Sequence, residues 1–456
     1  MRSAIFLTLT LLGLSCVLPV NAQTNSGTWV TTGSLNTGRG GHTATLLNDG
    51  LVLVVGGSDS GGNDLASAEL YNPATGMFAA TGNLNALRLW HSATALPNGM
   101  VLVVGGYHVD GGNAAPVNTA ELYDPVAGTF TNTGSLVAPA RFLSTATLLA
   151  SGKVLIAGGS DRDGNSLSSA ELYDPASGTF TSTGSMNSQR QFHAATLLNN
   201  SKVLVTGGFD SSGNVLSSAE LYDSTAGTFT TISAMNVTRF THTSTLLNSG
   251  QVLIAGGYDL SFATLTSAEL YDPVAGTFTL TGSLSAGRSS PTVTLLNNGQ
   301  VLFVGGIDLG VNVADAELYD PTAGTFAAIA NPTTARYIQT ATLLNNGTVL
   351  VAGGVTATGS TLSSAEIYTP LPSISSLSPT SGPVGTTVTI TGTNFGPTQG
   401  SSTITFHGTA AVPTLWNTSG ILVPVPNGAT SGLIVITVNR SQASLNFQVL
   451  DLSLAN

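Results

Sequence analysis

The sequence predicts an all-β fold: a seven-bladed β-propeller closed by its N-terminal strand and followed by a small β-sandwich. A segment of about fifty residues with short apolar runs and glycine pairs recurs along the chain, a period typical of propellers in which each repeat forms one blade. Beyond Tyr368 the period ends and a different alternating pattern begins. The arginine that opens each copy marks the period most clearly, as Arg39, Arg88, Arg141, Arg190, Arg239, Arg288 and Arg336.

Each copy is expected to form four strands. In the copy that begins at Arg190, "HAATLL" alternates and leads into a turn, and "KVLVTGG" is an apolar run suited to a strand covered on both faces. "SSAELYD" and "GTF" follow as the third and fourth strands. The turn between them reads "DPxxG" in most copies, because Pro presets φ and Gly supplies the positive φ that closes such a turn.

The two ends of the repeat region are expected to meet. The segment "GTWVTTGSL" from Gly27 to Leu35 matches the fourth strand of a repeat, whereas the seventh repeat stops after "AEIYTP" without a fourth strand. The strand with Trp29 should therefore lie beside the strand with Glu366 and complete the last blade. This closure removes a free sheet edge.

The repeated residues resemble those of a known family. A copy contains a glycine pair such as Gly56 and Gly57, a later tyrosine such as Tyr71, and an aromatic residue in its last strand such as Phe130. Over residues 27–370 this pattern is similar to the kelch repeat, with Phe where that family usually has Trp. The resemblance implies a kelch-type propeller domain.

A second domain is expected over residues 373–450, after the Pro-bearing linker "TPLPS". Its first segment resembles the IPT/TIG family of immunoglobulin-like domains, and alternating stretches such as "TVTIT" and "LIVITVN" favour a small β-sandwich. Such domains space, brace or bind. The residues that carry the resemblance are Pro379, Gly382, Gly385, Val388, Ile390, Gly392 and Phe395.

Residues 1–22 read as a secretory signal peptide. Arg2 precedes an apolar run from 4 to 14, and Val20, Asn21 and Ala22 form a small-residue cleavage site. The alternative is a lipoprotein signal that ends at Cys16. With the signal peptide removed, the exported chain would contain no cysteine and hence no disulfide, since the sequence has 1 Cys.

The charge of the chain limits the classes of binding partner. Only 8% of the residues are charged and the net charge is -11, which argues against nucleic acid or an anionic membrane surface as partner. No membrane span is expected after signal removal, because no other apolar run is long enough. A glycan or an extracellular protein is the expected partner, and the oligomeric state stays open.

Insertions place the expected binding surface on one end of the propeller, which we call the loop face. It comprises the residues around each repeat arginine and the loops between the second and third strands; the opposite turn face carries the "NNG" and "DPxxG" turns. Length variation falls almost entirely in the loop-face segments, as is common for the binding face of a repeat protein. Aromatic side chains there could stack on sugars or simply pack between blades. The candidates are Trp90, Tyr107, Phe142, Phe192, Phe240, Tyr258 and Tyr337, with His108 and Asp110 in the longest loop.

The most regular charges are expected to be structural. All seven Glu occupy one repeat position, and each is matched by a repeat arginine. A buried Glu needs such a partner, so we predict one Arg–Glu pair per blade rather than a charged ring for a ligand. These glutamates are Glu69, Glu121, Glu171, Glu220, Glu269, Glu317 and Glu366.

Metal sites are weakly indicated. Four repeats place a histidine three residues after the arginine (His42, His91, His193 and His242), where packing competes with metal ligation. The loop "DRDGN", with Asp161, Asp163 and Asn165, resembles the start of a calcium loop but lacks the Glu that an EF-hand has at its twelfth position. No cofactor is expected, with calcium as the weak alternative. Aspartates also recur at the equivalent place in other loops, as Asp59, Asp210, Asp259 and Asp308.

The function expected from these features is binding, not catalysis. A kelch propeller with an immunoglobulin-like domain resembles galactose oxidase, a resemblance that implies a copper enzyme with a Tyr–Cys crosslink, but the exported chain would lack the cysteine. We therefore expect a secreted, extracytoplasmic protein that recognises a glycan or protein through its loop face. The alternative is a carbohydrate-active enzyme at the channel mouth, and fold analogy alone does not decide for it.

Overall fold

The computed structural model describes residues 27–110, 113–137, 139–438 and 441–450, and within these ranges the secondary structure consists of β-strands. The expected all-β fold is thus confirmed. The signal peptide predicted over residues 1–22 lies outside the described residues. Within them, no helix is long and apolar enough to cross a membrane.

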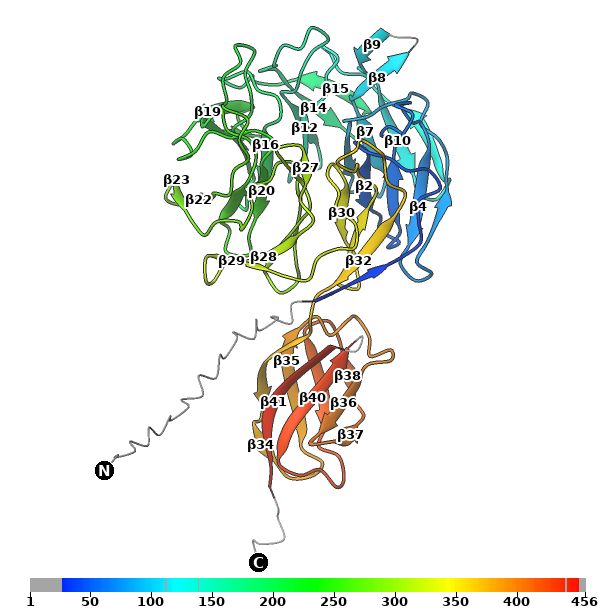
Figure 1. The fold of residues 1–456 in the computed structure, drawn as a ribbon, viewed down its shortest axis with the longest axis vertical. Coiled ribbons are helices and arrows are strands. Elements are labelled where there is room, and N and C mark those ends of the chain that lie inside the picture. The colour runs from blue at the N-terminus through cyan, green and yellow to red at the C-terminus, as the bar shows by residue number, and fades with distance from the viewer. Residues whose placement is uncertain (1–26, 111–112, 138, 439–440, 451–456) are drawn as a thin grey trace, which may run out of the picture.

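Seven four-stranded antiparallel sheets make up the described part of the propeller, and each forms one blade (Figure 1). From the inner strand outwards, the first three blades are β2 (Thr43–Leu46), β3 (Val52–Val55), β4 (Ala68–Asn72) and β5 (Met77–Ala80); β6 (Ser92–Ala95), β7 (Val101–Val104), β10 (Ala120–Asp124) and β11 (Thr129–Asn132); and β12 (Thr145–Leu148), β13 (Val154–Ala157), β14 (Ala170–Asp174) and β15 (Thr179–Ser182). The next two are β16 (Ala194–Leu197), β17 (Lys202–Thr206), β18 (Ala219–Asp223) and β19 (Thr228–Thr231); and β20 (Thr243–Leu246), β21 (Val252–Ala255), β22 (Ala268–Asp272) and β23 (Thr277–Leu280). The last two are β24 (Thr292–Leu295), β25 (Val301–Val304), β28 (Ala316–Asp320) and β29 (Thr325–Ala328); and β30 (Thr340–Leu343), β31 (Val349–Ala352), β32 (Ala365–Thr369) and β1 (Thr28–Thr31).

The ring closes through the N-terminal strand. β1 pairs antiparallel with β32, with Trp29 opposite Tyr368 and Thr31 opposite Glu366. The Trp29 ring lies 5.0 Å from that of Tyr368, and its Nε1 donates to Ala330 O at 2.7 Å. The inner strands β2, β6, β12, β16, β20, β24 and β30 each contact the next, and β30 contacts β2.

The core of the propeller lies between the blades. Second strands such as β3 and β7 are buried along their whole length because neighbouring blades cover both faces. In the fourth strands only the phenylalanine is buried in most blades, where it packs on the tyrosine of the third strand, as Phe78 does on Tyr71 with ring centroids 4.8 Å apart. Each core cluster draws on two blades, for example Leu53 with Val103 and Tyr123.

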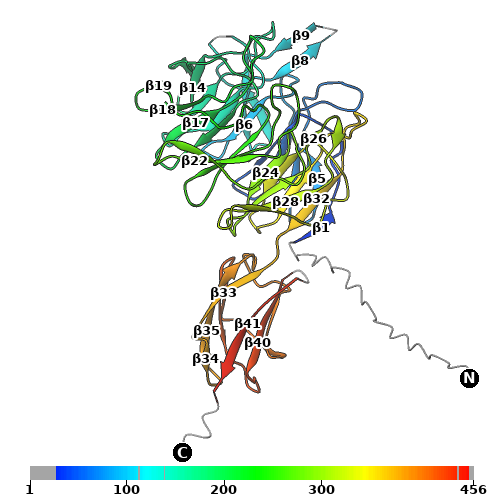
Figure 2. The same cartoon turned by 60° about the vertical axis from the view of Figure 1, so that its left-hand side comes forward.

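Two loops of the loop face form small hairpins of their own. One consists of β8 (Tyr107–Asp110) and β9 (Asn113–Pro116), and the other of β26 (Ile307–Asp308) and β27 (Val311–Asn312). The hairpin β8–β9 lies at the end of the propeller far from the C-terminal domain, as both ribbon views show (Figures 1 and 2).

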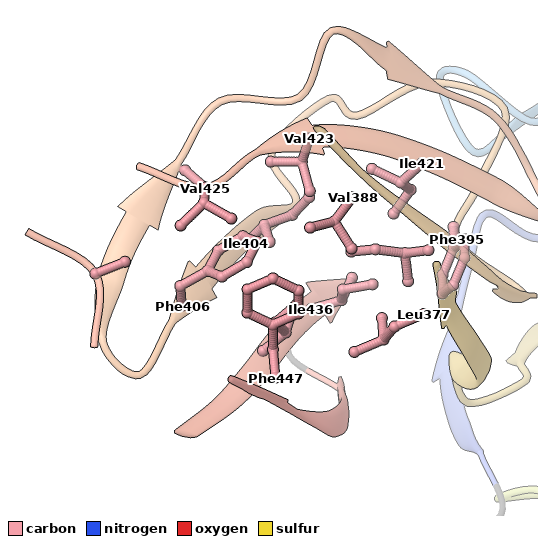
Figure 3. Close-up of a cluster of buried hydrophobic side chains, with 14 of the residues drawn as sticks. Leu377, Val388, Phe395, Ile404, Phe406, Ile421, Val423, Val425, Ile436 and Phe447 are labelled. Carbon is pink, nitrogen blue, oxygen red and sulfur yellow. The ribbon is translucent and has the colours of Figure 1, made fainter. Parts of the chain in front are cut away.

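The C-terminal domain is a two-sheet β-sandwich. One sheet has the order β33 (Ser373–Ser378), β35 (Thr387–Thr393), β39 (Gly420–Pro424) and β38 (Leu415–Trp416). The other has the order β34 (Ser381–Gly382), β41 (Ser441–Val449), β40 (Gly432–Val438), β36 (Thr403–Phe406) and β37 (Thr409–Ala411). Alternate residues such as Val388, Ile436 and Phe447 fill the space between the sheets (Figure 3).

Candidate functional site

A buried Arg–Glu pair lies at the loop-face end of every blade. In the fourth blade, Arg190 Nη2 donates to Glu220 Oε1 at 2.7 Å, and Arg190 Nη1 donates to the carbonyl oxygens of Gly207 and Ser218. Glu220 also accepts the backbone N–H of Asn187 at 2.7 Å and that of Ser188 at 3.1 Å. The pair therefore holds two parts of the blade together through hydrogen bonds. One part is the connection that comes from the preceding blade, and the other is the second and third strands.

The same pairing recurs in the other six blades. Burial lowers the pKa of Arg190, while the hydrogen bond and charge of Glu220 raise it. All seven arginine side chains are fully buried, so these charges are unavailable to a ligand, and their role is structural. The remaining Nη2–Oε1 distances are 2.7 Å for Arg39–Glu69, 2.7 Å for Arg88–Glu121, 3.1 Å for Arg141–Glu171, 2.9 Å for Arg239–Glu269, 2.5 Å for Arg288–Glu317 and 2.9 Å for Arg336–Glu366.

The four repeat histidines are buried packing residues. Each Nε2 lies within hydrogen-bond distance of a threonine hydroxyl, as His193 does at 3.1 Å from Thr145 Oγ1 and His42 at 3.1 Å from Thr340 Oγ1. Burial, with a smaller contribution from the nearby arginine, lowers the pKa of His193 to about 3 and that of His91 to about 3. These imidazoles are therefore neutral at physiological pH.

The weak calcium candidate uses its oxygens within its own loop. Asp161 Oδ1 accepts the backbone N–H groups of Asp163 and Asn165, each at 2.9 Å, and Asp161 Oδ2 accepts the Asn165 side-chain amide at 3.1 Å. These are the bonds of an Asx turn, which needs no ion. Across the described residues, no group of three or more His, Cys, Asp or Glu side chains is arranged to hold a metal.

The inner rim of the loop face is a ring of residues with positive φ, which we call the mouth ring. Each member stands two positions after a repeat arginine and has φ between +45° and +65°. Positive φ is rare for side chains such as Trp, Phe and Ile, and such strain is often found at functional sites. The members are Gly41, Trp90, Leu143, Phe192, Thr241, Ser290 and Ile338.

Three predicted aromatic residues meet at the second and third blades. Phe142 lies 4.8 Å from Tyr107 and 6.2 Å from Trp90, measured between ring centroids. Trp90 is 42% exposed although it is one of the largest apolar side chains. An exposed indole on a firm aromatic base is a suitable stacking surface for a sugar ring.

A second aromatic group covers the fourth and fifth blades. Phe240 lies at its centre, within 5.4 to 6.2 Å of Tyr258, Phe262, Phe209 and Phe192. Phe240 is only 6% exposed, so it supports the group and does not offer a contact surface, contrary to its place among the predicted ligand residues. Phe192 is 37% exposed and Phe262 57% exposed.

Sequence reasoning did not select Phe262 as a candidate. It lies four residues beyond Tyr258, at a loop position where the first, third, fourth and seventh repeats have glycine, and this difference was the available signal. These glycines are Gly62, Gly164, Gly213 and Gly359. The mouth-ring conformation had no sequence signal, because only Gly41 among its members favours positive φ.

The other predicted ligand residues are more dispersed. His108 Nδ1 and the backbone N–H of Val109 lie 3.2 and 2.6 Å from Asp64 Oδ2, so an aspartate of the first blade holds the hairpin β8–β9. The side chain of Asp110 lies outside the part of the chain that the structure describes. Tyr337 belongs to the seventh blade and is partly buried beside Val355.

Two hollows lie on the turn face. One of about 590 Å³ is lined by Asn298, Gln300 and Asp320 of the propeller together with Ser373 and Thr393 of the sandwich. A second, of about 420 Å³, runs beside the linker at Leu371. The loop face thus offers an exposed aromatic rim, whereas the turn face offers hollows next to the second domain.

Fold and site together define a class of β-propeller with an appended sandwich domain. Comparison with known families places Kelch motifs at residues 144–187 and 192–236 and an IPT/TIG domain at residues 372–451. The chain therefore carries Kelch motifs in its propeller and an IPT/TIG domain at its C-terminus. No curated protein sequence matches the chain.

Two solved structures illustrate the shared architecture. A fungal alcohol oxidase of the AA5 family, solved in complex with copper, is 18% identical with a TM-score of 0.62; the match covers 94% of this chain and 100% of that one. YjhT is 14% identical with a TM-score of 0.53, and the match covers 65% of this chain and 99% of YjhT. At these identities the likeness shows the fold alone.

Proposed function

We propose that this protein is an exported glycan-binding protein whose ligand contacts the loop face of the propeller. The Kelch propeller and the IPT/TIG domain support a role in binding or interaction. The observation that carries the finer proposal is the exposure of Trp90 and Phe192, both held at positive φ in the mouth ring. Aromatic faces of this kind stack on the apolar faces of sugars.

The low charge of the chain supports a neutral ligand. Charged residues make up 8% of the sequence, and the seven repeat arginines and seven glutamates are consumed in buried pairs. What remains on the loop face is aromatic, hydroxyl and amide chemistry together with the loop aspartates, which suits sugar hydroxyls.

A binding screen tests the proposal. The chain without residues 1–22 is run through native gels that contain soluble glucan, galactan, mannan, xylan or arabinan, and retardation by at least one polysaccharide is expected. Trp90→Ala and Phe192→Ala should each weaken that retardation at least tenfold. Val126→Ala, at a 98% exposed position on the turn face, is the control and should retain it. If none of the five polysaccharides retards the protein, glycan binding is rejected, and retention on an extracellular protein would then favour the other class of partner.

A further inference from the structure

The mouth ring is narrow, since backbone hydrogen bonds join four of its seven neighbouring pairs. Trp90 N donates to Gly41 O at 3.0 Å, Thr241 N to Phe192 O at 3.0 Å, and Ser290 N to Thr241 O at 3.3 Å. At the roughly 5 Å spacing typical of hydrogen-bonded neighbours, a ring of seven residues has a radius of about 6 Å, measured at Cα. Since backbone atoms occupy much of that radius, a polysaccharide chain cannot thread the mouth, and a glycan meets it with one end or lies across it.

The mouth ring is also chemically asymmetric. Thr241 and Ser290, from the fifth and sixth blades, are its two hydroxyl-bearing members and lie next to one another. On the far side of the ring Trp90 lies against Gly41, where an added Cβ would come within 3.1 Å of the indole. The mouth thus has an aromatic side and a hydroxyl side.

The hydroxyl side continues into an unrepeated polar cluster. Thr241 Oγ1 lies 2.6 Å from the buried Ser289 Oγ, which is 3.4 Å from Ser290 Oγ. Burial raises the pKa of the Tyr258 phenol against the lowering effect of Ser289, and the charge of Asp308 adds to the rise. The cluster therefore joins hydroxyl groups of the fifth and sixth blades at one side of the mouth.

Asp308 differs from the aspartates of the equivalent loops. Asp259 Oδ1 accepts hydrogen bonds within its own loop, from the backbone N–H of Ser261 at 2.8 Å and from that of Ala263 at 3.0 Å. Asp308 instead accepts the hydroxyl of Thr264 from the neighbouring blade. Its carboxylate is thus held between two blades, on the threonine that bridges Tyr258 in the fifth blade.

We infer that the mouth ring binds the terminal sugar of a glycan end-on, with Trp90 against one face of the sugar and Thr241, Ser290 and Asp308 hydrogen-bonding its hydroxyl groups. This inference rests on the proposed function and adds the subsite and the mode of binding. The ligand class is a neutral glycan with an unsubstituted end, because the cluster offers acceptors and hydroxyls but no free cation.

The experiment compares chain length and site variants. Methyl glycosides of glucose, galactose, mannose and N-acetylglucosamine are titrated by ligand-observed NMR, and the polysaccharide found in the gels is titrated by calorimetry at two chain lengths. One glycoside should bind and compete with the polysaccharide, and the stoichiometry should be one protein per chain at both lengths. Thr241→Val, Ser290→Ala and Asp308→Asn should each raise the Kd of that glycoside at least tenfold, whereas the matched control Asp259→Asn should change it less than twofold.

The outcomes separate the two proposals. Polysaccharide binding that stays normal in Thr241→Val, Ser290→Ala and Asp308→Asn, or that scales with chain length, overturns end-on recognition and leaves glycan binding intact. If Trp90→Ala is the one variant that loses polysaccharide binding, end-on recognition is likewise overturned and glycan binding stays intact. If wild-type protein binds no polysaccharide and no glycoside, both proposals fail. Near-UV circular dichroism of each variant verifies that the propeller is folded.

Discussion

Arg190 Nη2 lies 2.7 Å from Glu220 Oε1, and the exposed fractions of the two side chains are 0% and 1%. The carboxylate also accepts the Asn187 backbone and side-chain N–H groups at 2.7 and 2.8 Å. A buried ion pair is stable only when both charges are compensated in this way. Because the pair recurs in every blade, it is the main polar interaction that stabilises the loop-face connections.

Removing one charge of this pair should destabilise the propeller strongly. Glu220→Gln leaves the Arg190 guanidinium buried without a counter-charge, and we expect a loss of about 3 to 5 kcal/mol in the free energy of unfolding. Urea unfolding followed by fluorescence measures it. The control is Lys202→Gln, which removes the exposed ion pair with Asp223 in the same blade and should leave the midpoint nearly unchanged. Equal midpoints for the two variants would contradict a structural role of the buried pair.

The buried histidines should make stability fall in acid. In the folded protein the pKa of His193 is lowered from 6.5 to about 3, so below pH 6.5 the unfolded chain binds a proton that the folded chain does not. Stability is therefore independent of this group above pH 6.5 and falls by about 1.4 kcal/mol per pH unit as pH decreases from 6.5 towards 3.

His193→Gln isolates that contribution. Gln339 occupies the equivalent position in the seventh blade and donates from Nε2 to Val304 O at 2.9 Å, so the substitution is compatible with the fold. The slope of unfolding free energy against pH between 6 and 4 should decrease by about 1.4 kcal/mol per unit. A slope identical to that of the wild type would show that His193 is not the group responsible.

Closure of the ring should depend on Trp29. Trp29→Ala removes the ring contact with Tyr368 and the hydrogen bond to Ala330 O. Because Trp29 is only partly buried, we expect a loss of about 2 to 3 kcal/mol, below the range for a fully buried aromatic residue. Thermal unfolding and limited proteolysis at the N-terminus measure this effect, and Val30→Ala, 59% exposed on the same strand, is the control. If Trp29→Ala unfolds at the same temperature and is cleaved at the same rate as the wild type, Trp29 does not stabilise the closure of the ring.

The sequence predicted the features that depend on residues within a single repeat. The period, the "NNG" and "DPxxG" turns and the unmatched fourth strand at Trp29 suffice for the sheet arrangement, and the equal numbers of repeat Arg and Glu indicated their pairing. Contacts between residues of different blades could not be predicted from the sequence. Thr241 and Ser289 come from different repeats, and the rotation between blades brings their hydroxyl oxygens to 2.6 Å from one another. Positive φ at Trp90 or Phe192 contradicts local propensity and is imposed by packing.

The most direct test of the account is ¹⁹F NMR of protein labelled with 5-fluorotryptophan. The chain has 3 Trp, and the resonance that disappears in Trp90→Phe identifies the one on the loop face. Addition of the polysaccharide selected by the gels should shift this resonance and leave those of Trp29 and Trp416 in place. A saturating polysaccharide that shifts only the Trp29 or Trp416 resonance would locate binding elsewhere and contradict recognition through the loop face.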